Sequence, residues 1–258
     1  MELTITTWNV NSLRVRLPSV LEWIKAHGPS VLCLQETKIQ DHDFPAGEFS
    51  ALGYESAWYG QKTYNGVSIH TRGSHSDVRQ GLPDAVFNEQ KRVISLVYEG
   101  ITVVNAYIPQ GESVESDKFA YKLAFLSQLR DYLSELMAGR EHVVLAGDLN
   151  IAPDERDLFD AELFRGQVMF HPREHAFLDE LRGMGLSDAL RIHSGGGGIY
   201  SWWDYRGGAF WKNQGIRLDH LWISPSLAPF CSGVTVDTSE RKRKKPSDHT
   251  PVTATLRR

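Results

Sequence analysis

The chain has 258 residues, of which 41% are hydrophobic and 23% are charged, a composition that excludes a disordered protein and fits one large domain or two small ones. No apolar run approaches the roughly 20 residues of a membrane-spanning helix, and no signal-peptide pattern precedes the first predicted strand. The net charge of −4 neither requires nor excludes a nucleic-acid partner, because the distribution of charge matters more than its sum.

The chain contains two cysteines, Cys33 and Cys231. Cys33 lies inside an apolar run, where a buried free thiol is the usual state. We therefore expect no disulfide and a reducing cytoplasmic location. We also expect no membrane association and a monomer without an obligate protein partner.

Short apolar segments recur along the chain and predict β-strands. Their ranges are 3–8, 31–34, 66–70, 92–97, 101–108, 143–146, 218–223 and 252–256. Some segments alternate between apolar and polar residues, whereas others are continuous, which indicates strands buried on both faces.

Three helices are predicted between these strands. In the first, Pro18 suits the first turn, an apolar stripe runs to Ile24, and Gly28 ends the helix. The second covers about 117–137 with Gly139 as its C-cap, and the third covers about 174–182. No Pro/Ser-rich linker divides the chain, so we expect residues 1–258 to form a single α/β domain of two packed sheets covered by helices.

Polar residues cluster where the predicted strands begin or end. They are Asn9, Asn11, Glu36, Tyr107, Asp148, Asn150, Asp219, Asp248 and His249. Active sites are often built at such positions, and carboxylate and amide oxygens are the ligands that Mg²⁺ and Mn²⁺ prefer. No Cys/His cluster has zinc spacing and no phosphate-binding P-loop is present, so the sequence predicts a magnesium or manganese site.

Each of these residues also has a simpler interpretation when taken alone. Asn9 or Asn11 could cap the following helix, and Asp148 and Asn150 could shape a turn. Glu36 and His249 could be ordinary surface groups, and Asp219 could be an ordinary ion-pair partner. The repeated placement of the whole set at strand ends favours one shared site.

Six motifs, in this order, resemble those of the exonuclease III and apurinic-apyrimidinic (AP) endonuclease family. They are WNVNSLR at 8–14, LQETK at 34–38, NAYIP at 105–109, GDLNIAP at 147–153, RLDH at 217–220 and SDHTP at 247–251. YNGV at 64–67 and SWWDYR at 201–206 add to the resemblance, which spans about residues 3–256.

The resemblance implies a four-layered α/β sandwich of the endonuclease/exonuclease/phosphatase type, with two mixed sheets flanked by helices. It also implies DNA repair chemistry that depends on Mg²⁺ or Mn²⁺. The implied reactions on double-stranded DNA are incision 5′ to abasic sites, 3′-phosphatase action and 3′→5′ exonuclease action, as in base excision repair.

The resemblance, together with the needs of phosphodiester hydrolysis, suggests a role for each candidate. Glu36 is expected to be the principal metal ligand, and Asn9 to support it. Asp148 would orient or deprotonate the attacking water, Asn150 would fix its angle, and both would lie within reach of the metal.

A second group would act on the phosphate. His249 would contact the scissile phosphate or the metal, and Asp219 would hold its tautomer and favour its charged form. Tyr107 would donate to the phosphate or to the leaving oxygen. Asp248 would bind the metal through water.

The resemblance also implies a DNA surface. Trp202, Ile216 and Leu218 would line a pocket for an extruded abasic sugar, although Leu218 could equally belong to the core. Contacts to the DNA, mainly to its phosphates, are expected from Asn11, Lys62, Tyr64, Gln110, Arg206, Lys212, Arg241, Lys242, Arg243, Lys244 and Lys245. The last five form a basic block that could also be a solvated loop.

Two alternatives belong to other functional classes. Inositol-phosphate phosphatases and sphingomyelinases share the strand-end Glu, Asp-x-Asn and Ser-Asp-His pieces, but the Trp-rich loop and the YNGV segment favour the DNA branch. A non-catalytic nucleic-acid binding module would be expected to lack some of the ligands, and this sequence has them all.

Overall fold

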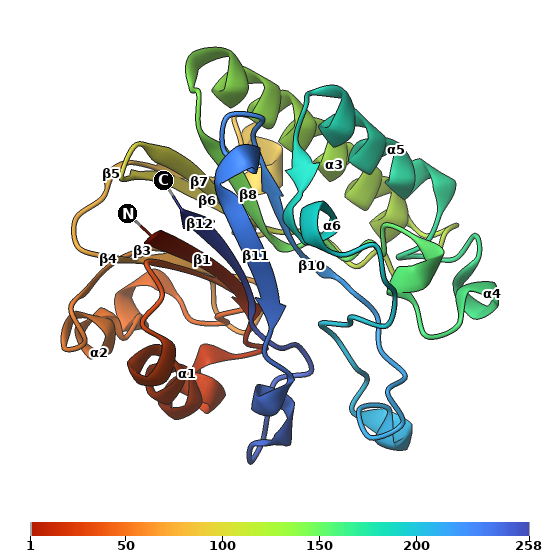
Figure 1. Cartoon of the computed structure of the whole chain (residues 1–258), viewed down its shortest axis with the longest axis horizontal. Helices are drawn as coiled ribbons and strands as arrows, with labels where there is room; N and C mark the ends of the chain where they lie inside the picture. Colours follow the sequence, from red (N-terminus) through yellow and green to blue (C-terminus); the bar gives the residue numbers. More distant parts are fainter. Residues whose placement is uncertain (1, 258) are drawn as a thin grey trace.

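Two six-stranded β-sheets dominate the computed structural model, which describes residues 2–257 (Figure 1). The strand order in the first sheet is β11 (Cys231–Val236), β12 (Val252–Arg257), β1 (Glu2–Asn9), β2 (Val31–Gln35), β4 (Val67–Arg72) and β3 (Tyr54–Tyr59). The order in the second is β5 (Ser76–Gln80), β6 (Val93–Tyr98), β7 (Ile101–Tyr107), β8 (Val143–Asp148), β10 (Asp219–Ile223) and β9 (Ser187–Asp188).

Helices cover the outer faces of the two sheets (Figure 1). On the first sheet lie α1 (Leu13–His27) and α2 (Ala46–Ser50), and on the second lie α3 (Asp117–Gly139) and α5 (Pro172–Gly183). The short helices α4 (Ala161–Phe164) and α6 (Ala189–His193) complete the set. Three apolar clusters separate these four layers, one between the sheets and one under each helical layer. The predicted four-layered sandwich is confirmed.

The two sheets share an arrangement that brings particular strand ends together. In the first, β1 runs parallel to β2 and antiparallel to β12; in the second, β8 runs parallel to β7 and antiparallel to β10. Carboxyl ends of β1, β2, β7 and β8 therefore lie at the same edge of their sheets as the amino ends of β10 and β12. The register sets Asp219 directly opposite Asp148 across the β8–β10 pair.

The predicted strands correspond to β1, β2, β4, β6, β7, β8, β10 and β12, and all eight occupy interior positions. The four strands that the sequence pattern missed, β3, β5, β9 and β11, are the four edge strands. An edge strand buries less of its surface, and every residue of β5 is exposed, so its sequence carries no apolar pattern.

The helix predictions need two corrections. Helix α1 begins at Leu13, so Pro18 lies inside the helix and not in its first turn. The backbone N–H groups of Ser12 and Leu13 donate to the carbonyls of Glu36 and Thr37, and these contacts fix the earlier start. Gly28 ends the helix in the left-handed conformation as predicted, whereas α3 runs through Gly139 and has Arg140 as its C-cap.

Cys33 and Cys231 are both buried free thiols, as expected. Among the helices in residues 2–257, none combines the length and the apolar character needed to cross a bilayer.

A buried histidine on β4 makes stability depend on pH. His70 accepts or donates one hydrogen bond with Ser56 and one with Ser68, at 2.7 and 2.9 Å, and stacks on Phe49. Burial lowers the pKa of His70 to about 3, and the neighbouring His75 adds to the effect. The folded state therefore keeps the ring neutral, while the unfolded chain takes up a proton below pH ~6.5.

We predict that His70→Phe flattens the pH dependence of unfolding. The neutral His70 makes its full contribution to the free energy of unfolding above pH ~6.5. As the pH falls below this value, the contribution decreases by at most about 1.4 kcal/mol per pH unit. Urea unfolding between pH 7 and pH 4 measures the two slopes. The exposed His193→Phe serves as control and should keep the wild-type slope. Equal slopes for His70→Phe and wild type would contradict the assignment.

Candidate active site

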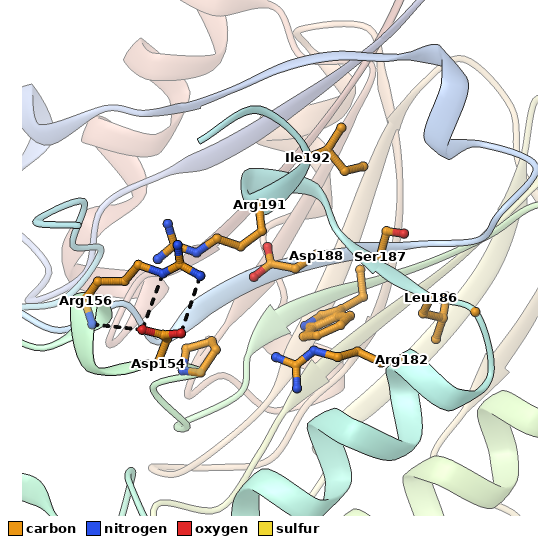
Figure 2. Close-up of a pocket in the computed structure, with 11 residues that line it drawn as sticks. Asp154, Arg156, Arg182, Leu186, Ser187, Asp188, Arg191 and Ile192 are labelled. Carbon is orange, nitrogen blue, oxygen red and sulfur yellow. Dashed lines mark hydrogen bonds and ion pairs between the residues drawn. The ribbon is translucent and has the colours of Figure 1, made fainter. Parts of the chain in front are cut away.

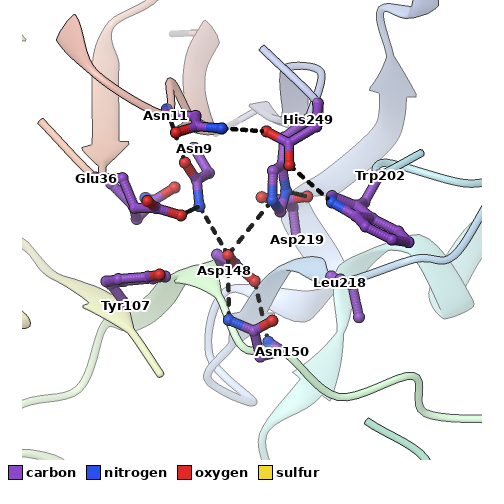
Figure 3. A network of polar contacts seen from close by, with 12 residues as sticks. Asn9, Asn11, Glu36, Tyr107, Asp148, Asn150, Trp202, Leu218, Asp219 and His249 are labelled. Atoms are coloured by element: carbon purple, nitrogen blue, oxygen red, sulfur yellow. Dashed lines mark hydrogen bonds and ion pairs between the residues drawn. The ribbon is translucent and has the colours of Figure 1, made fainter. Parts of the chain in front are cut away.

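An amide and two carboxylates meet where β1, β2 and β8 end (Figure 3). The Asn9 side-chain nitrogen donates to Glu36 at 2.8 Å and to Asp148 at 2.9 Å. Asn9 and Asp148 are almost completely buried, whereas Glu36 remains partly accessible. Asn9 thus connects the carboxylate that follows the first sheet's β2 with the carboxylate at the end of the second sheet's β8.

The loop after β8 turns back on its own carboxylate. The backbone N–H of Asn150 donates to Asp148 at 3.0 Å, and its side-chain amide donates to the carbonyl of Ile108 at 2.9 Å. Gly147 is needed before this turn, because a Cβ there would lie 1.9 Å from the carbonyl oxygen of Ala106. Glu36 and Asn150 both adopt positive φ angles, a cost that ordered surroundings must offset.

His249 stands between two buried aspartates (Figure 3). Its Nδ1 lies 2.8 Å from Asp219, and its Nε2 lies 3.7 Å from Asp148. The Ser201 hydroxyl accepts the backbone N–H groups of Leu218 and Asp219, which fixes the start of β10. The second oxygen of Asp219, Oδ1, has no hydrogen-bond partner within residues 2–257.

The charge states of His249, Asp148 and Asp219 depend on their burial and on one another. Burial alone would lower the pKa of His249, but Asp219 and Asp148 outweigh it and raise that pKa to about 10. Burial raises the pKa of Asp148, an effect that the charge of His249 partly offsets. At neutral pH the imidazole is therefore a cation that can donate from both ring nitrogens.

Tyr107 closes β7 beside these groups (Figure 3). Burial raises the pKa of its phenol, and the charges of Glu36 and Asp148 raise it further. The guanidinium of Arg92 lies 4.6 Å from the ring centroid and counters part of this effect. The phenol therefore keeps its proton and is available as a hydrogen-bond donor.

Asp248 lies on the outer side of the site. One carboxylate oxygen accepts from Asn11 at 3.0 Å, and the other accepts from the indole of Trp202 at 3.1 Å. The side-chain oxygen of Asn11 also accepts a hydrogen bond from the Lys38 ammonium, and this ammonium pairs with Glu36 at 2.8 Å. The hydrogen bonds thus continue from the site towards the loop that carries Trp202.

The donor set fits a hard divalent cation. The carboxylates of Asp148 and Asp219 and the ring of His249 bring polar atoms within 4.8 Å of one another, and the second oxygen of Asp219 is buried without a hydrogen-bond partner in residues 2–257. Because the His249 ring is protonated, the carboxylates and not the imidazole would hold a cation. Glu36 adds a partly exposed carboxylate held in place by Asn9. Carboxylate oxygens in this number suit Mg²⁺ or Mn²⁺.

The predicted DNA contacts occupy two regions. Lys62 and Tyr64 are exposed on the loop before β4, and Tyr64 and Gln110 line a cavity of about 630 Å³ that Tyr107 also borders. Arg206 and Lys212 are exposed on the loop before β10.

The basic block is not a uniform phosphate surface. Arg241 is buried: its guanidinium donates to the carbonyls of Ser247 and Trp203 and lies against the rings of Tyr205 and Phe210. Arg241 is therefore the member of this block with the least surface available to DNA phosphates. Arg243 pairs with Glu22 and Glu240, whereas Lys242, Lys244 and Lys245 are exposed.

Two of the three residues predicted to line the sugar pocket are inaccessible to solvent or nearly so. Ile216 and Leu218 are almost fully buried in a small cluster with Ala152, Leu158 and Phe170. The sequence left open a place in the core for Leu218, and Ile216 is equally buried. Trp202 alone of the three predicted pocket residues stays partly exposed, at the edge of this cluster (Figure 3).

A buried lysine that sequence reasoning missed supports the site loops. Lys122 on α3 has no exposed surface; it donates to the carbonyl of Asn150 at 2.8 Å and to that of Gln110 at 3.2 Å, and pairs with Glu174 on α5. Glu174 in turn accepts from the backbone N–H of His171. A polar residue inside the apolar stripe of α3 was the available signal.

Arg217 was also missed, although it lies within a quoted motif. Its guanidinium is buried and pairs with Asp157 at 2.7 Å and with Asp188 at 2.7 Å. These two ion pairs anchor the chain two residues before Asp219. Ser247 has a similar supporting role, because its hydroxyl donates to the carbonyl of Asn9 and accepts from the N–H of His249.

Comparison with known proteins identifies the class. The Endonuclease/Exonuclease/phosphatase family model matches residues 6–249. The chain therefore belongs to this family, whose members depend on divalent metal ions.

Individual relatives narrow the group. Exodeoxyribonuclease III of Haemophilus influenzae is 34% identical over 260 residues, covering 96% of this chain and 97% of the relative. The 3′ phosphatase NExo from Neisseria, solved with a product DNA hairpin, has a TM-score of 0.97 at 39% identity and covers 99% of this chain and 100% of that one. An AP endonuclease from Archaeoglobus fulgidus gives a TM-score of 0.93 at 36% identity, covering 98% and 99%. The predicted resemblance to exonuclease III and AP endonucleases is confirmed.

We predict that Lys122→Met destabilises the fold by about 3–5 kcal/mol, because it leaves the Glu174 carboxylate buried and unpaired. Urea unfolding measures the loss. The double variant Lys122→Met with Glu174→Gln should recover part of it by removing the orphaned charge. Lys118→Met, on the exposed side of the same helix, is the matched control and should unfold like wild type. Wild-type stability of Lys122→Met would show that the pair is dispensable.

Proposed function

We propose that the chain is a divalent-metal-dependent DNA repair phosphodiesterase. Its substrates would be double-stranded DNA with abasic sites, which it incises on the 5′ side, and DNA with 3′ ends, from which it removes nucleotides or blocking groups. One observation carries the proposal: Asn9, Glu36, Asp148, Asp219 and His249, distant in sequence, meet in one site that pairs a cationic imidazole with clustered carboxylates.

His249 acts on the scissile phosphate. Asp219 orients the ring through Nδ1 and keeps it protonated, so that Nε2 can donate to a non-bridging oxygen as negative charge develops. Both ring nitrogens face carboxylates, which favours this role over metal ligation. Tyr107 donates its proton to the phosphate or to the leaving oxygen.

Asp148 and Asn150 position the attacking water. The raised pKa of Asp148 suits a carboxylate that accepts a proton near neutral pH. Asn150 is fixed by Asp148 and by Ile108, which leaves its amide oxygen available to set the angle of the water.

Glu36 is the principal protein ligand for Mg²⁺ or Mn²⁺ in this proposal, with Asp148 and Asn150 within reach and Asp248 acting through water. Asn9 supports them as a hydrogen-bond donor. The bound cation supplies Lewis-acid relief of charge on the phosphate. Lys38, which pairs with Glu36, neutralises part of the carboxylate charge.

The duplex is proposed to lie across the exposed loops that carry Lys62, Tyr64, Gln110, Arg206 and Lys212, with Asn11 and Trp202 nearer the site. Lys242 on the basic block would add a phosphate contact. Residues 1–258 are proposed to act as a single catalytic domain, as a monomer, in the cytoplasm.

The activity itself is tested on four substrates: an abasic duplex, a 3′-phosphate duplex, an inositol phosphate and sphingomyelin, each with Mg²⁺ or Mn²⁺. We expect turnover of the DNA substrates alone. Glu36→Gln should reduce DNA cleavage on the order of 10²-fold or more, since it removes charge from the metal site. The exposed Glu48→Gln is the matched control and should cleave at the wild-type rate. Cleavage of the inositol phosphate or of sphingomyelin, or full activity of Glu36→Gln, would refute the proposal.

The DNA surface is tested by the salt dependence of duplex binding. Replacing Arg206 and Lys212 by Gln should reduce the slope of log affinity against log salt by about 0.9 for each phosphate that the protein no longer neutralises. Lys25→Gln, at the far end of α1, should leave the slope unchanged. An unchanged slope in the double variant would remove this loop from the interface.

A further inference from the structure

A second cavity, of about 470 Å³, is lined in part by the segment that follows β8 (Figure 2). Its walls come from that segment, from the end of α5, and from β9 and α6. None of the residues that line it in the described chain, 2–257, belongs to the group around Asp148 and His249. The proposed function therefore leaves this cavity unused.

Three guanidinium groups line the cavity: Arg156, Arg182 and Arg191 (Figure 2). The carboxylate of Asp188 also faces it, but both oxygens of Asp188 accept hydrogen bonds from Arg217 behind the wall, at 3.2 and 2.7 Å. That partner compensates the negative charge of Asp188. Asp154 also lines the cavity and pairs with Arg156, and Arg191 pairs with Asp157 behind it. Three arginines against two aspartates in the lining leave a small positive excess, which suits an anion.

Two buried donors at the cavity have no acceptor. The indole N–H of Trp222, whose side chain has no exposed surface, and Nε of Arg191 both lack a hydrogen-bond partner within residues 2–257. An indole N–H and a guanidinium N–H can only donate. Unsatisfied buried donors are rare, and here both belong to residues that line one cavity, so the missing partner should carry acceptor oxygens.

Arg182 can supply charge to such a partner. Its guanidinium lies 5.5 Å from the ring centroid of Trp222 and pairs with Asp179, at 2.6 Å. Both members of that pair are about half exposed or more, at 49% and 71%. Exposed pairs contribute little stability, and a guanidinium binds phosphate oxygens in bidentate fashion, so Arg182 can exchange Asp179 for a phosphate.

We propose that this cavity is a second ligand site, and that it binds a small phosphate monoester of about the size of a nucleoside monophosphate. Arg182 and the Trp222 indole N–H would hold the phosphate oxygens, and Arg191 would add a donor through Nε. The volume falls within the usual range for small-molecule sites and exceeds what a bare phosphate ion fills.

The binding test is a titration followed by the indole ¹⁵N–¹H signals of the labelled full-length protein, with the Trp222 signal assigned from Trp222→Phe. Deoxyadenosine 5′-monophosphate is the probe, and deoxyadenosine, inorganic phosphate and citrate are the comparison ligands. We expect a saturable downfield shift of the Trp222 signal with the nucleotide, a weaker response to inorganic phosphate, and none with deoxyadenosine or citrate. No shift with the nucleotide at millimolar concentration, or an equal response to deoxyadenosine or citrate, would overturn the proposal.

Two variants separate this site from the rest of the molecule. Arg182→Gln changes an exposed side chain and should weaken nucleotide binding at least about tenfold, while Arg173→Gln, on the same helix outside the cavity, should bind like wild type. Glu36→Gln should leave the Trp222 response intact, which distinguishes the cavity from the active site. Unchanged affinity in Arg182→Gln with preserved signal dispersion would refute the assignment.

Discussion

The rest of the site depends on holding three carboxylates, Glu36, Asp148 and Asp219, close together in a mostly buried place. Like charges repel strongly where water is scarce, so each carboxylate needs a compensating donor. The Asn9 amide serves Glu36 and Asp148, and the His249 imidazolium serves Asp148 and Asp219. One oxygen of Asp219 stays without a donor in the described chain, and a cation would complete the balance.

This constraint explains why the fold needs both sheets. Asn9 ends a strand of the first sheet, Glu36 follows one and His249 precedes one, whereas Asp148 and Asp219 belong to the second sheet. A buried polar link joins the sheets beneath them: Gln35 donates to Asn105 at 2.7 Å, and Asn105 donates to the carbonyls of Leu34 and Ser68. The hydrogen bonds fix the relative position of two surfaces that apolar packing alone would fix less sharply.

The sequence allows the prediction of features that repeat or that bring distinctive chemistry to strand ends. Interior strands such as β7 and β8 are buried on both faces and stand out, whereas the edge strand β5 is fully exposed and its sequence resembles that of a loop. Glu36 and Asp148 could be identified because each follows an apolar run. The position of Lys122 in the apolar stripe of α3 signals its burial, but its partner could not be predicted, because Glu174 lies 52 residues away and no local pattern encodes that pairing.

Arg241 shows a further limit, because charge in a sequence does not reveal which charges reach solvent. It lies in the most basic stretch of the chain, yet its guanidinium is buried against Tyr205 and Phe210 and bonded to the carbonyl of Trp203. It thereby braces the loop on which Arg206 is 90% exposed. A protein of net negative charge can present a positive surface in this way: a buried arginine supports the backbone of a loop, and another arginine on that loop faces the solvent.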